Sequence, residues 1–68
     1  MKALLFAIIP HRSWVNLQLA NGAELPDPDA RVEGTGKRIR HVKVRSVDDA
    51  RAPWLIRVVA AQIAYRAA

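Results

Sequence analysis

The sequence predicts a small α+β domain, in which an antiparallel sheet of about three strands is crossed on one face by a C-terminal helix. Two short segments in the first two thirds of the chain alternate apolar and polar residues, which is typical of strands. After Ser46 the apolar residues recur three and four positions apart, which indicates an amphipathic helix. With only 68 residues, the chain can form one domain at most.

Residues 2–9 are predicted to form the first strand. This stretch is apolar on both faces, as in a central strand covered on both sides. A signal peptide is disfavoured because the apolar run ends at Pro10 without a small-residue cleavage site. A second strand should start at Trp14, with alternate apolar residues on one face: Val15, Leu17 and Leu19. The short gap between the two strands predicts a hairpin.

The middle of the chain predicts a turn, an ordered loop and a third strand. Asn21-Gly22 is a strong turn dipeptide because both residues tolerate positive φ. Prolines within residues 24–36 favour an ordered loop. The third strand is predicted over residues 37–45. Its apolar alternation changes phase near Arg40, which indicates either a bulge or an edge strand with both faces partly wet.

The last third predicts helical structure. Ser46 is a candidate N-cap, and acids just after it favour the positive end of a short helical turn over residues 47–50. A longer helix is predicted to begin at Pro53 and to end at Arg66. Its predicted core stripe consists of Leu55, Val58, Val59, Gln62 and Ile63, and a flanking stripe of Trp54, Ala61 and Tyr65. One short sheet cannot cover so wide an apolar surface.

Positive charge is concentrated in one segment. The net charge is +5, and residues 37–45 contain five Lys or Arg residues and no acid. Two interpretations stay open: a solvated strand face that blocks edge-to-edge aggregation, or a surface that contacts an anion. The predicted anion-binding residues are Gly34, Gly36, Lys37, Arg38, Arg40, His41, Lys43 and Arg45. The segment has no aromatic residue for base stacking, which disfavours nucleic acid as the partner.

Catalysis and cofactor binding have little support. His11 and His41 have no carboxylate placed by the sequence to orient them, so no catalytic residues are predicted. The absence of cysteine excludes disulfides and thiolate zinc sites, and neither a metal site nor a cofactor is expected. Gly34-Thr35-Gly36-Lys37 departs from a phosphate-binding loop, which requires glycine at Arg31 and Ser or Thr at Arg38.

Four stretches resemble the YdhG-like domain family, a bacterial family of unknown function with a frataxin-like α+β fold. They are residues 10–17, "GAELPDPD" at 22–29, "EGTGKRIRHVKVRS" at 33–46, and Asp48-Asp49-Ala50 with Pro53. Their order and spacing agree over roughly residues 9–60. Some members are described as iron chaperones, which implies an alternative function here through Asp27, Asp29 or Glu33. A second alternative is nucleic-acid binding through the basic segment.

The resemblance also implies that residues 1–68 are a single, truncated domain. Family members typically have an N-terminal helix and further strands before the segment that corresponds to residues 2–9. Acids on that early helix are associated with frataxin-type iron binding, and this sequence has no such helix. We therefore expect a homodimer that replaces the missing layer. The expected function is a non-enzymatic interaction or anion-binding module, cytoplasmic and without a membrane partner, with Lys43 and Arg45 as its first test residues.

Overall fold

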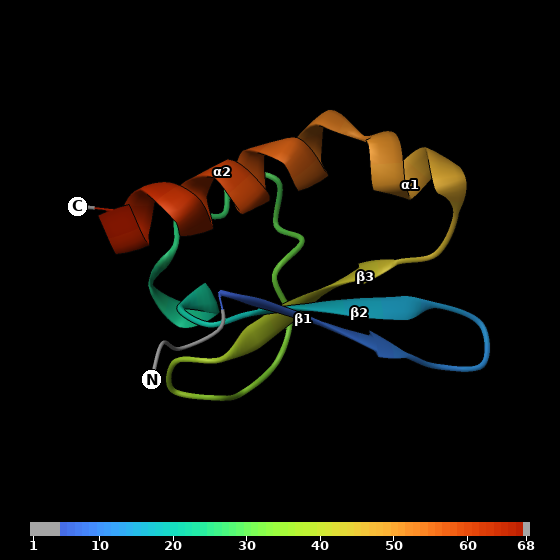
Figure 1. The fold of residues 1–68 in the computed structure, drawn as a ribbon, viewed down its shortest axis with the longest axis horizontal. Coiled ribbons are helices and arrows are strands. Elements are labelled where there is room, and N and C mark those ends of the chain that lie inside the picture. Colours follow the sequence, from blue (N-terminus) through green and yellow to red (C-terminus); the bar gives the residue numbers. More distant parts are fainter. Residues whose placement is uncertain (1–4, 68) are drawn as a thin grey trace.

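A computed structural model describes residues 5–67 and shows an α+β domain (Figure 1). A three-stranded antiparallel sheet, in the order β1-β2-β3, lies along one side of a long C-terminal helix. The predicted fold class is confirmed. The elements are β1 (Phe6–Pro10), β2 (Val15–Leu19), the 3-10 turn η1 (Gly22–Glu24), β3 (Arg40–Val44), α1 (Val47–Arg51) and α2 (Pro53–Ala67).

Strands β1 and β2 form the predicted hairpin. The backbone N–H of His11 donates to the carbonyl of Trp14 at 2.8 Å and closes the turn between them. The prediction of a central, doubly covered first strand is wrong: β2 is central and β1 is an edge strand. Ile8 on this edge strand is 72% exposed. The prediction failed because an apolar run shows that a strand needs to be covered, but it does not show that this chain provides the cover. Residues 2–4 of the predicted strand lie outside the described part.

The core lies between α2 and the face of the sheet formed by β2 and β3. Leu17 pairs with Val42 across these two strands, and Leu19 and Val42 are both fully buried. Apolar side chains from the loop and the helix complete the cluster: Leu25, Trp54 and Val58. Strand β1 lies farthest from β3 in the sheet, and it is covered less well than the other two strands.

The turn predicted at Asn21-Gly22 is present, but it does not use positive φ at Asn21. Asn21 has φ of −118°, and a 3-10 turn follows it. Gly22 is needed for close approach instead, since a Cβ at this position would lie 2.8 Å from Cβ of Arg40. The glycine therefore allows this turn to pack directly against the start of β3.

The loop before β3 is ordered by a short bridge. Glu33 and His41 exchange two backbone hydrogen bonds of 2.7 and 3.0 Å along the edge of β3 that points away from β2. The predicted third strand over residues 37–45 is too long, because β3 begins only at Arg40. Ile39 therefore lies before the strand. The apolar alternation changes phase where the strand begins, so no bulge is needed to explain it. Strand β3 lies at the second edge of the sheet, as one alternative predicted, but its helix-side face is not wet throughout because Val42 is fully buried.

The helical prediction is confirmed in its boundaries and corrected in its buried face. The Ser46 hydroxyl accepts a hydrogen bond from the N–H of Asp49 at 3.1 Å, which is the expected cap. The buried residues of α2 are Trp54, Val58 and Gln62, four positions apart. Ile63, predicted for the core, is 49% exposed, because the sheet lies under the Trp54 side of the helix. No helix within residues 5–67 has the length and apolar character that a membrane span requires.

Candidate functional site

The basic segment does not form one continuous surface. Lys37 and Arg38 lie in the loop before β3, and Arg45 follows the strand. Within β3, side chains alternate between the two faces of the sheet. His41 and Lys43 therefore lie on the outer face, away from α2, whereas Arg40 is in register with Leu19 on the helix-side face. Of the basic side chains in this segment, the structure brings His41 and Lys43 together on the outer face, and Gly34 lies beside the His41 ring.

Several residues of the predicted anion site already have partners in the fold. The Arg40 Nε donates to the carbonyl of Gly36 at 3.0 Å. The backbone N–H of Arg45 donates to the Asp49 carboxylate at 3.0 Å. Gly34 has φ of 116°, a conformation that strongly favours glycine. A Cβ on Gly36 would collide with the carbonyl of Ile39, so loop geometry accounts for both glycines.

An outer-face cluster surrounds Lys43, and it contains His11, Trp14, Asn16, Glu33 and His41. The Lys43 ammonium lies 3.6 Å from the Glu33 carboxylate and 5.2 Å from the centre of the Trp14 ring. The His11 ring stacks on Trp14 at 4.8 Å, and the Trp14 indole N–H donates to Asn16 at 2.9 Å. Because two partners already lie against the ring, Trp14 is not an open platform for a nucleic-acid base.

Sequence reasoning missed this cluster because its aromatic member lies outside the basic segment. Asn16 is paired with Lys43 across β2 and β3, and Trp14 lies two residues before Asn16 on the same strand path. The strand register was the missing signal, since it decides which side chains of separate segments become neighbours. Lys43 is not a free cation in this cluster, because the side chains of Lys43 and His41 both contact the carboxylate of one acid, Glu33.

The three acids proposed for metal binding each contact a different partner. The Asp27 carboxylate accepts the backbone N–H groups of Arg31 and Val32 at 3.0 and 3.1 Å. Asp29 accepts two hydrogen bonds from Arg57 at 2.6 and 2.9 Å, and these bonds lower the pKa of Asp29 below its ordinary 3.8. Over residues 5–67, no three His, Cys, Asp or Glu side chains gather in a way that suits a metal ion.

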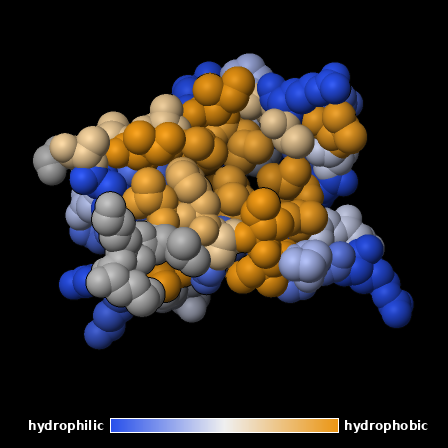
Figure 2. Space-filling view, in the orientation of Figure 1, coloured by the Kyte–Doolittle hydropathy of each residue, from blue (hydrophilic) through white to orange (hydrophobic). Residues whose placement is uncertain are grey.

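An apolar face shared by β1 and α2 is left uncovered by the described part of the chain. Figure 2 shows it as a continuous hydrophobic surface between the helix and the sheet. Ile8, Ile56 and Ile63 are 72%, 64% and 49% exposed on it. Two adjoining hollows shape the face, and neither has a charged residue in its lining. Their lining residues are Phe6, Ala7, Ile8, Leu17, Ala50, Leu55, Ile56, Val59, Ala60 and Ile63.

The apolar face ends at β1, which has no strand partner on its second edge among residues 5–67. The hydrogen bonds from Ala20 N–H to Leu5 and from His11 N–H to Trp14 mark the residues of β1 and its flanks that bond to β2. Such residues alternate along an antiparallel strand. The N–H and C=O groups of Phe6 and Ile8 therefore point away from β2, toward the open side. Backbone hydrogen-bonding groups and exposed apolar side chains are thus presented together.

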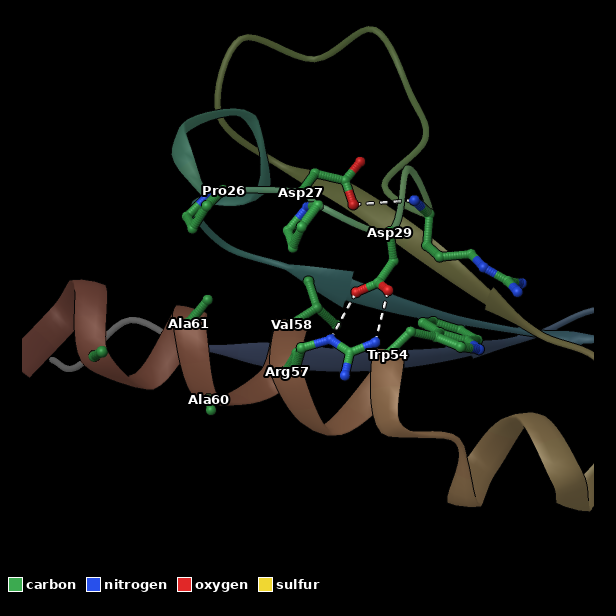
Figure 3. Close-up of a pocket in the computed structure, with 11 residues that line it drawn as sticks. Pro26, Asp27, Asp29, Trp54, Arg57, Val58, Ala60 and Ala61 are labelled. Carbon is green, nitrogen blue, oxygen red and sulfur yellow. Dashed lines mark hydrogen bonds and ion pairs between the residues drawn. The ribbon is translucent and has the colours of Figure 1, made fainter.

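A loop–helix cleft lies on the other flank of α2 (Figure 3). It has a volume of about 400 Å³ between the proline-containing loop and the helix. Two contacts hold the loop to the helix: the Asp29–Arg57 ion pair, and a cation–π contact in which the Arg31 guanidinium lies 4.6 Å from the centre of the Trp54 ring. Figure 3 shows Asp29 reaching from the loop to Arg57, with Trp54 beside the pair.

Comparison with known proteins gives no match: no family model, curated protein or solved structure is similar to this chain. The resemblance to the YdhG-like family therefore stays a prediction. Three features of the structure bear on function: the apolar face, the outer-face cluster and the loop–helix cleft.

Proposed function

We propose that this chain is a non-enzymatic interaction module that forms a twofold homodimer through its apolar face. The observation that supports this most directly is the exposure of Ile8, Ile56 and Ile63 on one continuous surface. Soluble monomers rarely leave large contiguous apolar patches in water, and such patches are typical of interaction sites. A small core makes the need for a partner greater, because domains of this size are only marginally stable alone.

The charge distribution favours a second copy of the chain over a polyanion. The hollows of the apolar face have no charged residue in their linings, although the whole chain has a net charge of +5. A nucleic acid would need cations at the contact, which this face does not offer. Two copies that meet here keep the cations of their outer-face clusters away from the contact. Self-association is therefore possible despite the like net charge.

The free edge of β1 gives the dimer a definite geometry. Antiparallel pairing of β1 with its own copy, centred on Ile8, produces a six-stranded sheet with both α2 helices on the same face. Ile8 exchanges two backbone hydrogen bonds with its counterpart, and Phe6 N–H donates to the carbonyl of Pro10 in the other copy. Pro10 has no N–H, so the pairing ends there. Val59 and Ile63 then line the space between the two helices.

Membership of the YdhG-like family and a cytoplasmic location belong to the same proposal. The quoted motifs and their order support the family, and the α+β arrangement agrees with it. The cysteine-free composition fits a reducing compartment. The contacts of Asp27, Asp29 and Glu33 give no specific support to an iron chaperone, and the covered Trp14 ring gives none to a nucleic-acid binder.

Analytical ultracentrifugation tests the dimer. The wild-type protein should sediment at twice the chain mass at micromolar concentration. Ile8→Lys should sediment as a monomer with unchanged circular dichroism, because it places a charge at the centre of the contact while Ile8 contributes little to the core. Val47→Lys is the matched control, since Val47 is 65% exposed on α1 and is not in the lining of either hollow. A monomeric wild type, or a dimer that survives Ile8→Lys, would contradict the proposal.

A further inference from the structure

We infer that the loop–helix cleft binds a small carboxylate that has an apolar body. The cleft borders the proposed dimer contact at Ala60, which lines both the cleft and one hollow of the apolar face. Its other α2 residues, among them Trp54, Arg57, Val58 and Ala61, lie on a different flank of the helix from Leu55, Val59 and Ile63. The ligand site and the dimer can therefore be tested independently.

The walls of the cleft suit an apolar body of moderate size. Pro26 and Pro28 form the loop side, and three alanines with Val58 form the helix side. Alanines at 60, 61 and 64 leave the hollow open, because their side chains end at Cβ. A volume of about 400 Å³ falls in the range of small-molecule sites, which are mostly apolar with a few convergent polar groups.

The two arginines that line the cleft keep hydrogen-bond donors that the cited contacts do not use. Both carboxylates are engaged: Asp27 by two backbone N–H groups, and Asp29 by Arg57. Arg57 uses only its Nε and one terminal nitrogen in that pair, and a guanidinium has five N–H donors. Within residues 5–67, the Arg31 guanidinium has no carboxylate partner and rests on the Trp54 ring. A ligand with hydrogen-bond acceptors can use the remaining donors of Arg31 and Arg57.

A carboxylate is the acceptor that matches this arrangement best. The planar fork of an arginine binds the two oxygens of a carboxylate side by side, and such charge-assisted bonds are among the strongest in proteins. Arg31 is already oriented by Trp54, and Arg57 is fixed by Asp29. The apolar body of the ligand would then extend along Val58 and Ala61. Two sources offer this chemistry: a free carboxylic acid, and the C-terminal carboxylate of a peptide.

Nuclear magnetic resonance of the ¹⁵N-labelled full chain tests the site with 4-phenylbutyrate as the probe. The Trp54 indole N–H signal should shift and saturate, whereas the Trp14 indole on the outer face should stay unchanged. The neutral amide of the probe should bind about tenfold more weakly or worse, because it loses a charge-assisted contact. A short peptide that ends in phenylalanine, compared with its C-terminal amide, separates the two sources. Preferential binding of the acid form in either pair supports the inference.

Matched variants make the result specific to the cleft. Arg31→Gln should weaken binding about tenfold, and Arg12→Gln, an exposed arginine in the β1–β2 turn, should leave it unchanged. Ala64→Phe should abolish binding by filling the cleft from an exposed position, with an unchanged fold by circular dichroism. Equal binding of acid and amide, a response at Trp14 instead of Trp54, or no shift at millimolar probe would overturn the inference.

Discussion

The two flanks of α2 differ in how they are closed. On one flank, polar contacts attach the helix to the residues after β2: Gln62 bonds to Asn21, Arg57 to Asp29, and Tyr65 to Glu24. On the other flank, facing β1, the described residues make no such contact, and apolar side chains remain in water. The first flank thus fixes the position of the helix within the chain, and the second is available to a partner.

In the proposed dimer, stability and association depend on separate sides of one helix. Directional hydrogen bonds suit the closed flank, because they require a single position of the helix over the sheet. The open flank needs no such precision within the monomer, since its apolar groups gain free energy from any well-fitting cover. Substitutions on the closed flank should therefore change the stability of the monomer, and substitutions on the open flank should change its association.

The largest effect on stability is expected at Trp54, on the side of the helix that packs in the core. Trp54→Ala should lower the free energy of unfolding by about 3–5 kcal/mol, because Trp54 is only 7% exposed and packs in the core cluster. Ile56→Ala, on the open flank, should change monomer stability by less than about 0.5 kcal/mol. Urea denaturation at a protein concentration where the monomer dominates provides the measurement. Equal effects of the two substitutions would remove the distinction between the flanks.

An intermediate effect is expected at Gln62. Its side-chain oxygen accepts the backbone N–H of Asn21 at 2.8 Å, and its amide donates to the Asn21 side chain at 3.0 Å, while Gln62 itself is fully buried. Gln62→Leu should cost about 1–3 kcal/mol, because Asn21 is left with unpaired polar groups. Gln18→Leu, on the outer face of β2, is the control. Denaturation curves that coincide for Gln62→Leu and wild type would show that this pair does not hold the helix.

The smallest effect is expected at Asp29, and it should depend on pH. Arg57 holds the pKa of Asp29 below its ordinary 3.8, so the unfolded state binds the proton more readily than the folded state. The resulting stabilisation is present above pH 3.8 and is lost as the pH falls through the lower, folded-state pKa. Asp29→Asn should therefore lower the melting temperature slightly at pH 7, and this difference should vanish at strongly acidic pH. A difference that is independent of pH would assign the effect to packing.

Local signals predicted the helices and the turn well. Ser46 caps α1 through Asp49 as expected, and α2 begins at Pro53, because both features depend on residues close together in sequence. The sequence predicted less well which side chains of the basic segment share one surface. The sequence predicts one strand over residues 37–45, but only Arg40–Val44 pair with β2, and the pleat then separates Arg40 from Lys43.

The sequence by itself determined the order and type of the elements and the excess of apolar surface, because hydrophobic period and capping chemistry act over a few residues. Only the tertiary structure decided that β1 is an edge strand, that Trp54 and not Ile63 is buried, and that Trp14 lies beside Lys43. It also formed the loop–helix cleft from Asp29 and Arg57, 28 positions apart. Strand register and the side of the helix that faces the sheet depend on long-range packing, which no local pattern specifies.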